Sequence, residues 1–365
     1  MKILHIIDTL SMGGAENLLI GLAGEQLRLG HDVTVMPLVC PIHTTVRDKM
    51  EGKGIRVMPI KGKGTVYNPF FIFRIVRELK DYDIVHVHLF PALYWAGIAR
   101  MLSYVKVPLV YTEHSTNNKR RNNKILHATD RFVYSICYKM IVACSEKAKE
   151  TFCACYPTIK NVSAINNGVD TKTFQEAIPY TKNELLGVPE DTFLVTMVAR
   201  FMPMKRQDTI VEAMAKLPSN MHAVFVGGEE TDAGVVRVKE LVNQYGLSNR
   251  VHFLYTRNDV PRILKTSDVV LMASDYEGLS LSSIEGMAAG KPFVATNVNG
   301  LREVVGGAGL LFENKDVEEL INILLRLSKD KSFYEDISNK CLKRSDEFGV
   351  EKMTNAYLKL YTTLC

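Results

Sequence analysis

Short hydrophobic runs alternate with longer amphipathic stretches along most of the chain. In stretches such as residues 15–30 and 68–80, apolar side chains recur at helical spacing, and Gly30 closes the first of them. The runs between them have the length of single strands. We expect these strands at residues 2–8, 31–39, 55–60, 83–88, 107–113, 139–144 and 161–166, and then at 193–199, 222–228, 251–255, 268–273 and 292–296.

The alternation pauses near residue 170, where about ten residues of mixed polar character separate the two series. Strands that alternate with helices predict a parallel sheet covered on both faces. The pattern therefore predicts an α/β protein with two doubly wound, Rossmann-like domains in series. Residues 350–364 read as a further helix, apolar enough to pack against one of them.

Length and composition agree with two globular domains. The chain has 365 residues, 47% of them hydrophobic and 23% charged, and no apolar run approaches the ~20 residues of a membrane span. Asp8 interrupts the first apolar run too early for a secretory signal, so we expect a cytoplasmic protein. The seven cysteines lack the spacing of a metal or redox site and are expected to be buried free thiols.

Charge is unevenly distributed between the halves. Residues 1–170 hold 22 Lys and Arg against 14 Asp and Glu, a net of +8, and the remainder holds 23 against 26, a net of −3. A basic first half suggests contact with an anionic lipid surface or with an acceptor that carries phosphate. Its densest cluster, residues 119–124, is equally compatible with a solvated loop.

The run from Ser274 to Thr296 offers the most specific chemistry. Glu277 is expected on the loop after a strand, and Glu285 in the first turn of the next helix, beside backbone N–H groups that suit an anion. Acidic groups for hydroxyls and amides for phosphate are what a sugar nucleotide needs. A capping box that begins at Ser282 would give Glu285 a purely structural role instead.

Other polar residues also follow predicted strands, where ligands bind in such sheets. Arg200 and Lys205 could stabilise charge on a leaving diphosphate, although either could be a surface cation. His114 ends a strand and could contact a sugar hydroxyl or be structural. His86 and His88 share one strand face and are not expected to bind metal, because no third ligand lies at useful spacing.

An ordered set of motifs across nearly the whole chain resembles the retaining glycosyltransferase family 4, which has the GT-B fold of two Rossmann-like domains facing across a cleft. The Glu277–Glu285 block is the most specific part of the resemblance. The matching elements are residues 13–16, 83–88, 113–114, 142–146, 165–170, Arg200 with Lys205, Glu277 with Glu285 and the following residues 286–292, and residues 299–303.

The resemblance implies a catalytic set of four residues. Arg200 and Lys205 match the family's cations on the donor diphosphate. Glu277 matches the glutamate that holds the sugar hydroxyls, and His114 matches the histidine beside the donor sugar. The acceptor hydroxyl would attack from the face that the leaving phosphate occupies, with retention, and that phosphate would act as the base.

The resemblance also implies a donor-binding set. Glu285 would hold the ribose, and the backbone of Gly278, Leu279, Ser280 and Leu281 would line the diphosphate. Gly13 and Gly14 match a glycine loop close to donor and acceptor. Residues 1–170, with 350–365 packed back on them, would form the acceptor-side domain, and residues 171–349 the donor domain.

The sequence departs from the family pattern at three positions where glycine is usual, namely Ala199, Arg206 and Tyr255. The first two leave the diphosphate cations intact, whereas Tyr255 puts the base preference in doubt. Because cations face the leaving group, we expect neither a cofactor nor a metal. The single Asp-x-Asp, residues 81–83, lies far from the expected phosphate site.

Together these features predict a transferase that builds a cell-surface polysaccharide or glycolipid. Its partners would be a nucleotide sugar, a carbohydrate or lipid-linked acceptor and, peripherally, an anionic membrane on its cytoplasmic face, with no nucleic acid. An epimerase on the same fold and a non-catalytic sensor or scaffold remain alternatives. A dinucleotide oxidoreductase is disfavoured because the chain lacks G-x-G-x-x-G after its first strand.

Overall fold

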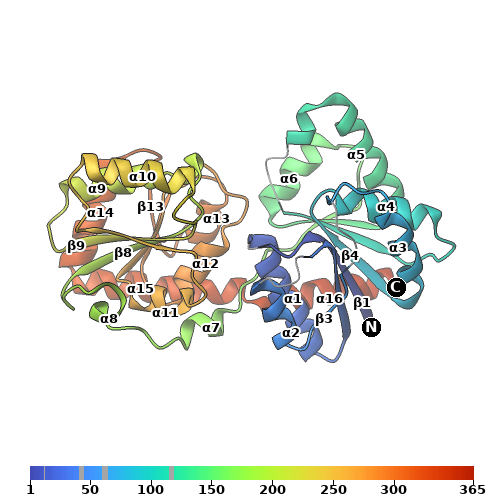
Figure 1. Ribbon diagram of the computed structural model, residues 1–365, viewed down its shortest axis with the longest axis horizontal. Coiled ribbons are helices and arrows are strands. Elements are labelled where there is room, and N and C mark those ends of the chain that lie inside the picture. Colours follow the sequence, from blue (N-terminus) through green and yellow to red (C-terminus); the bar gives the residue numbers. More distant parts are fainter. Residues whose placement is uncertain (12, 41–44, 60–64, 115–118) are drawn as a thin grey trace. The chain divides into compact units, whose positions relative to one another are not determined.

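The computed structural model describes the chain except for residues 12, 41–44, 60–64 and 115–118. The chain forms two compact units, each with its own sheet (Figure 1). The first unit contains residues 1–168 together with 350–365, and the second contains residues 169–349. The division at 168/169 lies beside the predicted boundary at 170.

A seven-stranded parallel sheet forms the centre of the first unit, in the order β3-β2-β1-β4-β5-β6-β7. This order places β1 between β2 and β4, so segments about 80 residues apart in sequence become neighbours. The strands are β1 (Lys2–Thr9), β2 (Asp32–Val39), β3 (Arg56–Val57), β4 (Ile84–His88), β5 (Leu109–Glu113), β6 (Met140–Ala143) and β7 (Val162–Ala164).

Helices cover both faces of this sheet. One core joins Leu4, Ile6 and their neighbours on the sheet to apolar side chains of α3, α4, α5 and α6. On the opposite face, α16 packs beside α1, where a Cβ on Gly21 would lie 3.2 Å from Val350. The helices are α1 (Gly14–Arg28), α2 (Thr45–Gly52), α3 (Phe71–Glu78), α4 (Ala92–Leu102), α5 (Lys124–Cys137), α6 (Glu146–Cys155) and α16 (Val350–Leu364).

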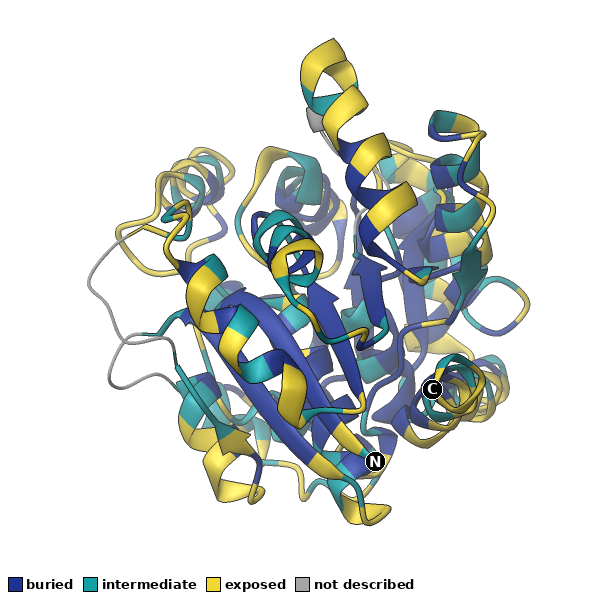
Figure 2. Ribbon diagram, turned by 90° about the vertical axis from the view of Figure 1, so that its right-hand side faces the viewer, coloured by how far each residue is buried: buried dark blue, intermediate teal, exposed yellow. Residues whose placement is uncertain are grey.

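Figure 2 shows the result of this layering, with strands of the first unit in the dark blue of buried residues and helices that alternate between buried and exposed faces. The predicted helix at 350–364 is present as α16, and it packs on the first unit rather than on the second, from which the chain arrives. Its Tyr357 and Tyr361 side chains are fully buried.

The second unit has a six-stranded parallel sheet in the order β10-β9-β8-β11-β12-β13. Its strands are β8 (Phe193–Val198), β9 (Met221–Val226), β10 (Val251–Tyr255), β11 (Val269–Met272), β12 (Phe293–Thr296) and β13 (Leu310–Phe312). Its helices are α7 (Thr171–Gln175), α8 (Lys182–Leu186), α9 (Gln207–Lys216), α10 (Ala233–Gln244), α11 (Val260–Thr266), α12 (Leu281–Ala288), α13 (Leu301–Val305), α14 (Val317–Lys329) and α15 (Lys331–Ser345).

Candidate functional site

An ion pair between Lys205 and Glu277 lies at the carboxyl end of the sheet in the second unit. Lys205 follows β8 and Glu277 follows the adjacent strand β11, so parallel pairing brings the two loops together. Ser274 is fully buried and donates its hydroxyl proton to the same oxygen, Glu277 Oε1, at 2.7 Å. The two ion-pair side chains are only 18% and 13% exposed, so water screens their charges weakly.

The loop that carries Arg200 and Lys205 is held from both sides. Gln207 donates its side-chain amide to the carbonyl of Arg200 at 3.1 Å. Gly227 and Gly234 lie very close to the main chain of this loop. A Cβ added to Gly227 would lie 2.4 Å from the Ala199 oxygen, and a Cβ added to Gly234 would lie 2.0 Å from the Phe201 oxygen. Backbone this close leaves no room for a side chain, so glycine is required at both positions.

The loop that carries Glu277 is supported in the same way. Thr296, at the end of β12, donates to the main-chain oxygen of Ser274 at 2.6 Å. A Cβ on Gly300 would lie 2.5 Å from the Glu277 oxygen, and the φ of Gly300 is +84°. The main-chain N–H of Asp275 also donates to the oxygen of Met204 at 2.8 Å, which joins the two loops directly.

Helix α12 begins directly after this loop, and its cap differs from the one expected. The N-cap is Ser280, which accepts from the N–H of Ser283, so the capping box predicted from Ser282 to Glu285 is absent and that interpretation is wrong. Glu285 is consequently the fifth helical residue, just beyond the first turn rather than in it. The predicted diphosphate segment, residues 278–281, forms the approach to this helix N-terminus, where anions are stabilised.

Two of the three departures from the family pattern lie where the backbone is left-handed. Arg206 has a φ of +54° and Tyr255 a φ of +51°, a region that glycine enters without strain. The Tyr255 hydroxyl donates to Glu230 at 2.9 Å and accepts from Lys239 at 2.7 Å. These two bonds fix the Tyr255 side chain at the end of β10. Glycine, the usual residue here, has no side chain to form them.

The glycine loop of the first unit lies between β1 and α1. Gly13 is the N-cap of α1, and a Cβ there would lie 2.4 Å from Glu16 Oε2, so the glutamate side chain folds back over the loop. Gly14 is the first helical residue. His114 follows β5 in the same unit. Gly13, Gly14 and His114 therefore belong to the first unit, and every other predicted site residue belongs to the second.

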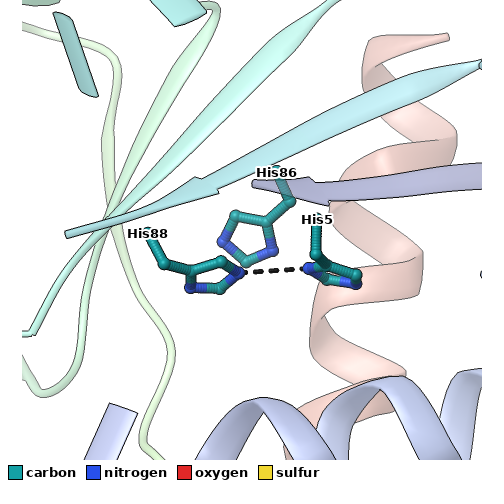
Figure 3. Close-up of side chains that lie close together, drawn as sticks. All are labelled: His5, His86 and His88. Atoms are coloured by element: carbon teal, nitrogen blue, oxygen red, sulfur yellow. Dashed lines mark hydrogen bonds between the residues drawn. The ribbon is translucent and has the colours of Figure 1, made fainter. Parts of the chain in front are cut away.

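A cluster of three buried histidines lies on the α1 and α16 side of the first sheet. Register pairs His5 of β1 with His86 of β4, and His88 follows on the same strand face (Figure 3). Their ligand atoms lie within 4.8 Å of one another. The argument that His86 and His88 lack a third partner was therefore wrong, because it counted spacing along the chain and the third histidine comes from the adjacent strand.

All six ring nitrogens of the three histidines already have hydrogen-bond partners, so a metal would have to displace these bonds. His86 Nε2 forms a hydrogen bond with the Thr112 hydroxyl at 2.7 Å, and His86 Nδ1 forms one with the Tyr361 hydroxyl at 2.6 Å. His5 and His88 bond to each other at 3.1 Å. Their remaining nitrogens meet Gln26 at 2.8 Å and His114 at 3.1 Å.

Burial keeps these histidines neutral. It lowers the pKa of His5 and of His114 to about 4, and it lowers the pKa values of His86 and His88 well below the ordinary 6.5, helped by the neighbouring histidines. The cluster therefore consists of neutral imidazoles at neutral pH, each with one N–H donor and one acceptor nitrogen.

Several features singled out in the sequence have structural roles or lie outside the described residues. The Asp83 carboxylate of the Asp-x-Asp accepts from the N–H of Lys2 at 2.7 Å, at the start of β1. Of the basic cluster, Arg121 lies 3.6 Å from Glu113, whereas the side chains of Lys119 and Arg120 are not described. All seven cysteines are free thiols, as predicted, but the expectation that they are buried is wrong for four of them. Only Cys137, Cys144 and Cys341 are buried.

Two residues to which the sequence assigned no role of their own complete the site. Ser274 and Gln207 carry no motif of their own, since their roles depend on which strand ends meet. His5 could have been noticed only from the expectation that the first strand lies beside the strand at 83–88. Among the described residues, the structure contains no helix of the length and apolarity that crossing a membrane requires.

Comparison with protein families agrees with this architecture. Residues 12–173 match the model described as Glycosyltransferase Family 4, and residues 181–344 match Glycosyl transferases group 1. A galactosyltransferase from Escherichia coli, UDP-Gal:alpha-D-GlcNAc-diphosphoundecaprenol alpha-1,3-galactosyltransferase, is 29% identical over 309 residues, covering 80% of this chain and 77% of the relative. N-acetyl-alpha-D-glucosaminyl L-malate synthase from Bacillus anthracis is 25% identical over 78% of this chain and 76% of its own.

Solved structures share the whole fold. The complex of Anabaena Alr3699/HepE with UDP has a TM-score of 0.86 and 24% identity over the full length of both chains. WaaG, a glycosyltransferase of lipopolysaccharide biosynthesis, has a TM-score of 0.74 and 17% identity over 99% of both chains. With two Rossmann-like units and both family models matched in order, the chain belongs to the GT-B glycosyltransferases of the group 1 and family 4 type.

Proposed function

We propose that this glycosyltransferase moves a sugar from a nucleoside diphosphate sugar to an acceptor hydroxyl with retention of anomeric configuration and without a metal. The observation that carries the proposal is the weakly exposed Lys205–Glu277 pair beside the N-terminus of α12. A cation, a carboxylate and helix amides on adjacent loops offer separate partners for phosphate and for sugar hydroxyls.

The second unit would hold the donor. Lys205, exposed Arg200 and the α12 amides would stabilise the charge that develops on the diphosphate as the glycosidic bond breaks. Glu277 would accept from the sugar hydroxyls, since its Oε1 is oriented by Ser274. Glu285 would hold the ribose. With both cations in place, the leaving phosphate would deprotonate the acceptor, and no metal would be needed.

The first unit would face the acceptor, with Gly13, Gly14 and His114 at the carboxyl ends of β1 and β5. The names of the Escherichia coli and Anabaena proteins point to UDP-sugars as the first donors to test and to a lipid-linked diphosphate saccharide as the first acceptor. That acceptor class would place the enzyme in polysaccharide or glycolipid synthesis at the cytoplasmic face of the membrane.

Helix α5 supports such a location. Its inner face is buried through Val133 and Tyr134, yet Ile125, Phe132 and Ile136 on its outer face are 77%, 51% and 57% exposed. These three side chains, which we call the α5 stripe, recur at helical spacing and so share one face. Lys124 and Arg131 are exposed on the same helix, so the stripe and its cations suit peripheral contact with an anionic membrane.

Transfer assays with matched variants test the donor assignment. Lys205→Ala and Glu277→Ala should each lower kcat/KM for transfer from a UDP-sugar by about 100-fold or more, as loss of transition-state charge stabilisation does. Lys216→Ala removes the cation of an ion pair with Glu318 that is mostly exposed on the same unit, and it should leave transfer unchanged. Equal activity of all three variants would contradict the assignment.

A panel of nucleotide sugars completes the test. The preferred donor should raise the Tm of the wild-type protein, because a ligand that binds only the folded state stabilises it. It should raise the Tm of Lys205→Ala less. Donor binding without turnover against any lipid-linked or free acceptor would favour the sensor alternative instead. Interconversion of nucleotide sugars without an acceptor would favour an epimerase.

A further inference from the structure

Four hydrogen-bonded side chains form a continuous chain from α1 to the end of β5. Gln26 Oε1 lies 2.8 Å from His5 Nε2, His5 Nδ1 lies 3.1 Å from His88 Nε2, and His88 Nδ1 lies 3.1 Å from His114 Nε2. Figure 3 shows the middle bond between His5 and His88. The first three side chains are buried, and only His114, at the strand end, is partly exposed.

The direction of every bond in this chain follows from its first member. In the orientation of the Gln26 amide that the structure gives, Oε1 faces His5 and can only accept, so His5 carries its proton on Nε2. A neutral imidazole has one proton, and His5 Nδ1 must therefore accept from His88 Nε2–H. By the same step His88 Nδ1 accepts from His114 Nε2–H, which leaves the proton of His114 on Nε2 and a lone pair on its Nδ1.

These bond directions hold only for neutral rings, and two observations indicate that the rings are neutral. Burial holds the pKa values of all three rings far below neutrality. A second proton on His5 or His88 would also point an N–H at a nitrogen that already carries one. His86 belongs to a separate branch with Thr112 and Tyr361, and its ring lies 4.1 Å from that of His88, which restricts the rotation of His88.

We propose that Gln26, His5 and His88 are positioning residues that hold His114 in the Nε2–H tautomer, so that its Nδ1 accepts a hydrogen bond from a substrate hydroxyl. The inference rests on the proposed function, with His114 in the role that the family resemblance implies for it, in contact with the sugar that is transferred. A neutral lone pair is favourable where positive charge develops on the sugar ring, whereas the N–H of the other tautomer would oppose that charge.

The tautomer can be read without substrate. Long-range ¹H–¹⁵N spectra of the full chain, labelled with ¹⁵N-histidine and assigned with single His variants, distinguish Nε2–H from Nδ1–H rings. We expect His5, His88 and His114 all to show the Nε2–H pattern from pH 6 to pH 8. An Nδ1–H pattern for His114, or conversion of the His5 and His88 signals to metal-bound ones by one equivalent of Zn²⁺, would overturn the proposal.

Two substitutions of His5 separate positioning from packing. In His5→Asn the side-chain oxygen takes the place of Nδ1 and can still accept from His88, whereas His5→Leu has similar bulk and no acceptor. We expect His5→Leu to move His114 toward the Nδ1–H tautomer and to lower kcat about 10-fold with donor KM within about two-fold. His5→Asn should keep the His114 tautomer and at least about half of kcat.

Identical His114 spectra and kcat in the two variants would contradict the proposal. If His5→Leu fails to fold, Gln26→Leu removes the acceptor at the far end and carries the same expectation. A wild-type protein that shows the Nε2–H pattern but transfers no sugar from any donor would refute the proposed function and leave the tautomer chain standing. The two failures are therefore distinguishable.

Discussion

Ser274 decides how the Glu277 carboxylate is presented, although no motif marks it. It is fully buried and its hydroxyl is 2.7 Å from Glu277 Oε1. In Ser274→Ala we expect Glu277 to lose this orientation and kcat to fall about 10-fold, which corresponds to the ~1.4 kcal/mol of one hydrogen bond to a charged group. Steady-state kinetics with a saturating acceptor would measure it.

Ser328→Ala is the matched control for that substitution, because Ser328 lies on α14, is exposed, and donates its hydroxyl proton to the Leu325 oxygen of the same helix. It should leave kcat unchanged. An unchanged kcat in Ser274→Ala as well would show that Lys205 alone orients the glutamate.

The buried histidines predict how stability depends on pH. In the unfolded chain each histidine binds a proton near pH 6.5, whereas the folded protein holds the pKa of His5 and of His114 at about 4. Between these values the unfolded state binds more protons, so stability is complete above pH 6.5 and is lost as pH falls toward 4. Urea unfolding at pH 7, 6 and 5 should show progressively lower midpoints.

His252 of the second unit has a pKa lowered to about 4 and contributes in the same direction. A His5→Asn variant lacks one of these titrating histidines. Its urea unfolding midpoint should therefore fall less steeply between pH 7 and pH 5 than that of the wild type. Midpoints that stay constant over this range in the wild type would contradict the burial of neutral rings.

The sequence shows which polar residues follow each predicted strand, but it does not show which of these residues contact one another. Glu277 and Lys205 were expected to serve sugar and phosphate separately, and the structure adds that the two side chains form an ion pair with each other. His5 was missed for the same reason that Ser274 was. Both acquire a role only when the strand order β1-β4 or β8-β11 brings distant segments together.

At the scale of elements, prediction succeeded wherever an apolar run was long enough to be buried on both faces of a sheet. All the predicted strands are present, and the structure adds the short edge strand β13 (Leu310–Phe312), which was not predicted. The expected strand at 55–60 shortens to Arg56–Val57, at the edge of the sheet, where it pairs with β2 alone. The pattern of apolar residues in the sequence indicates which strands are buried. It is therefore least informative for strands at the edges of a sheet, which are the least buried.

Helix α5 exposes the apolar side chains of the α5 stripe, which do not pack into the core of the first unit. We expect the α5 stripe variant Phe132→Ser with Ile136→Ser to weaken binding to vesicles that contain phosphatidylglycerol by about 10-fold or more, since each large apolar side chain contributes roughly 1.5–3 kcal/mol when buried. Vesicle sedimentation would measure the loss.

Ile178→Ser is the control, because Ile178 is 75% exposed in the second unit and lies outside the stripe. It should bind vesicles as the wild type does. Phosphatidylcholine vesicles should bind the wild type weakly, because they offer no negative charge to Lys124 and Arg131. Equal binding of all variants to both vesicle types would remove the membrane proposal.

At the scale of the molecule, the chain leaves the first unit at Gly168 and returns to it at Val350. The return could be anticipated only from the family resemblance, since the apolar face of residues 350–364 says that the helix packs without saying where. In the structure Tyr357 bonds to Thr112 at 2.9 Å and Tyr361 to His86 at 2.6 Å, so the last helix completes the polar core of the first unit.

The second unit is one continuous segment, residues 169–349, and can be produced as a fragment, whereas the first unit also needs residues 350–365 from the end of the chain. The ends of the second unit are paired with each other, because the N–H of Val169 donates to the Phe348 oxygen at 2.9 Å. A fragment of residues 169–349 should therefore unfold cooperatively, and on the proposed function the nucleotide sugar that stabilises the full chain should also raise the Tm of this fragment.

Residues 1–168 alone should lack cooperative unfolding, because the buried surface that α16 covers would be exposed and His86 and Thr112 would lose their tyrosine partners. Joining residue 168 to residue 350 by a short glycine linker should restore it, since the N–H of Gly168 already lies 3.1 Å from Met353 Sδ. Calorimetry of the three fragments measures this, and a cooperative transition in residues 1–168 alone would show that α16 is dispensable.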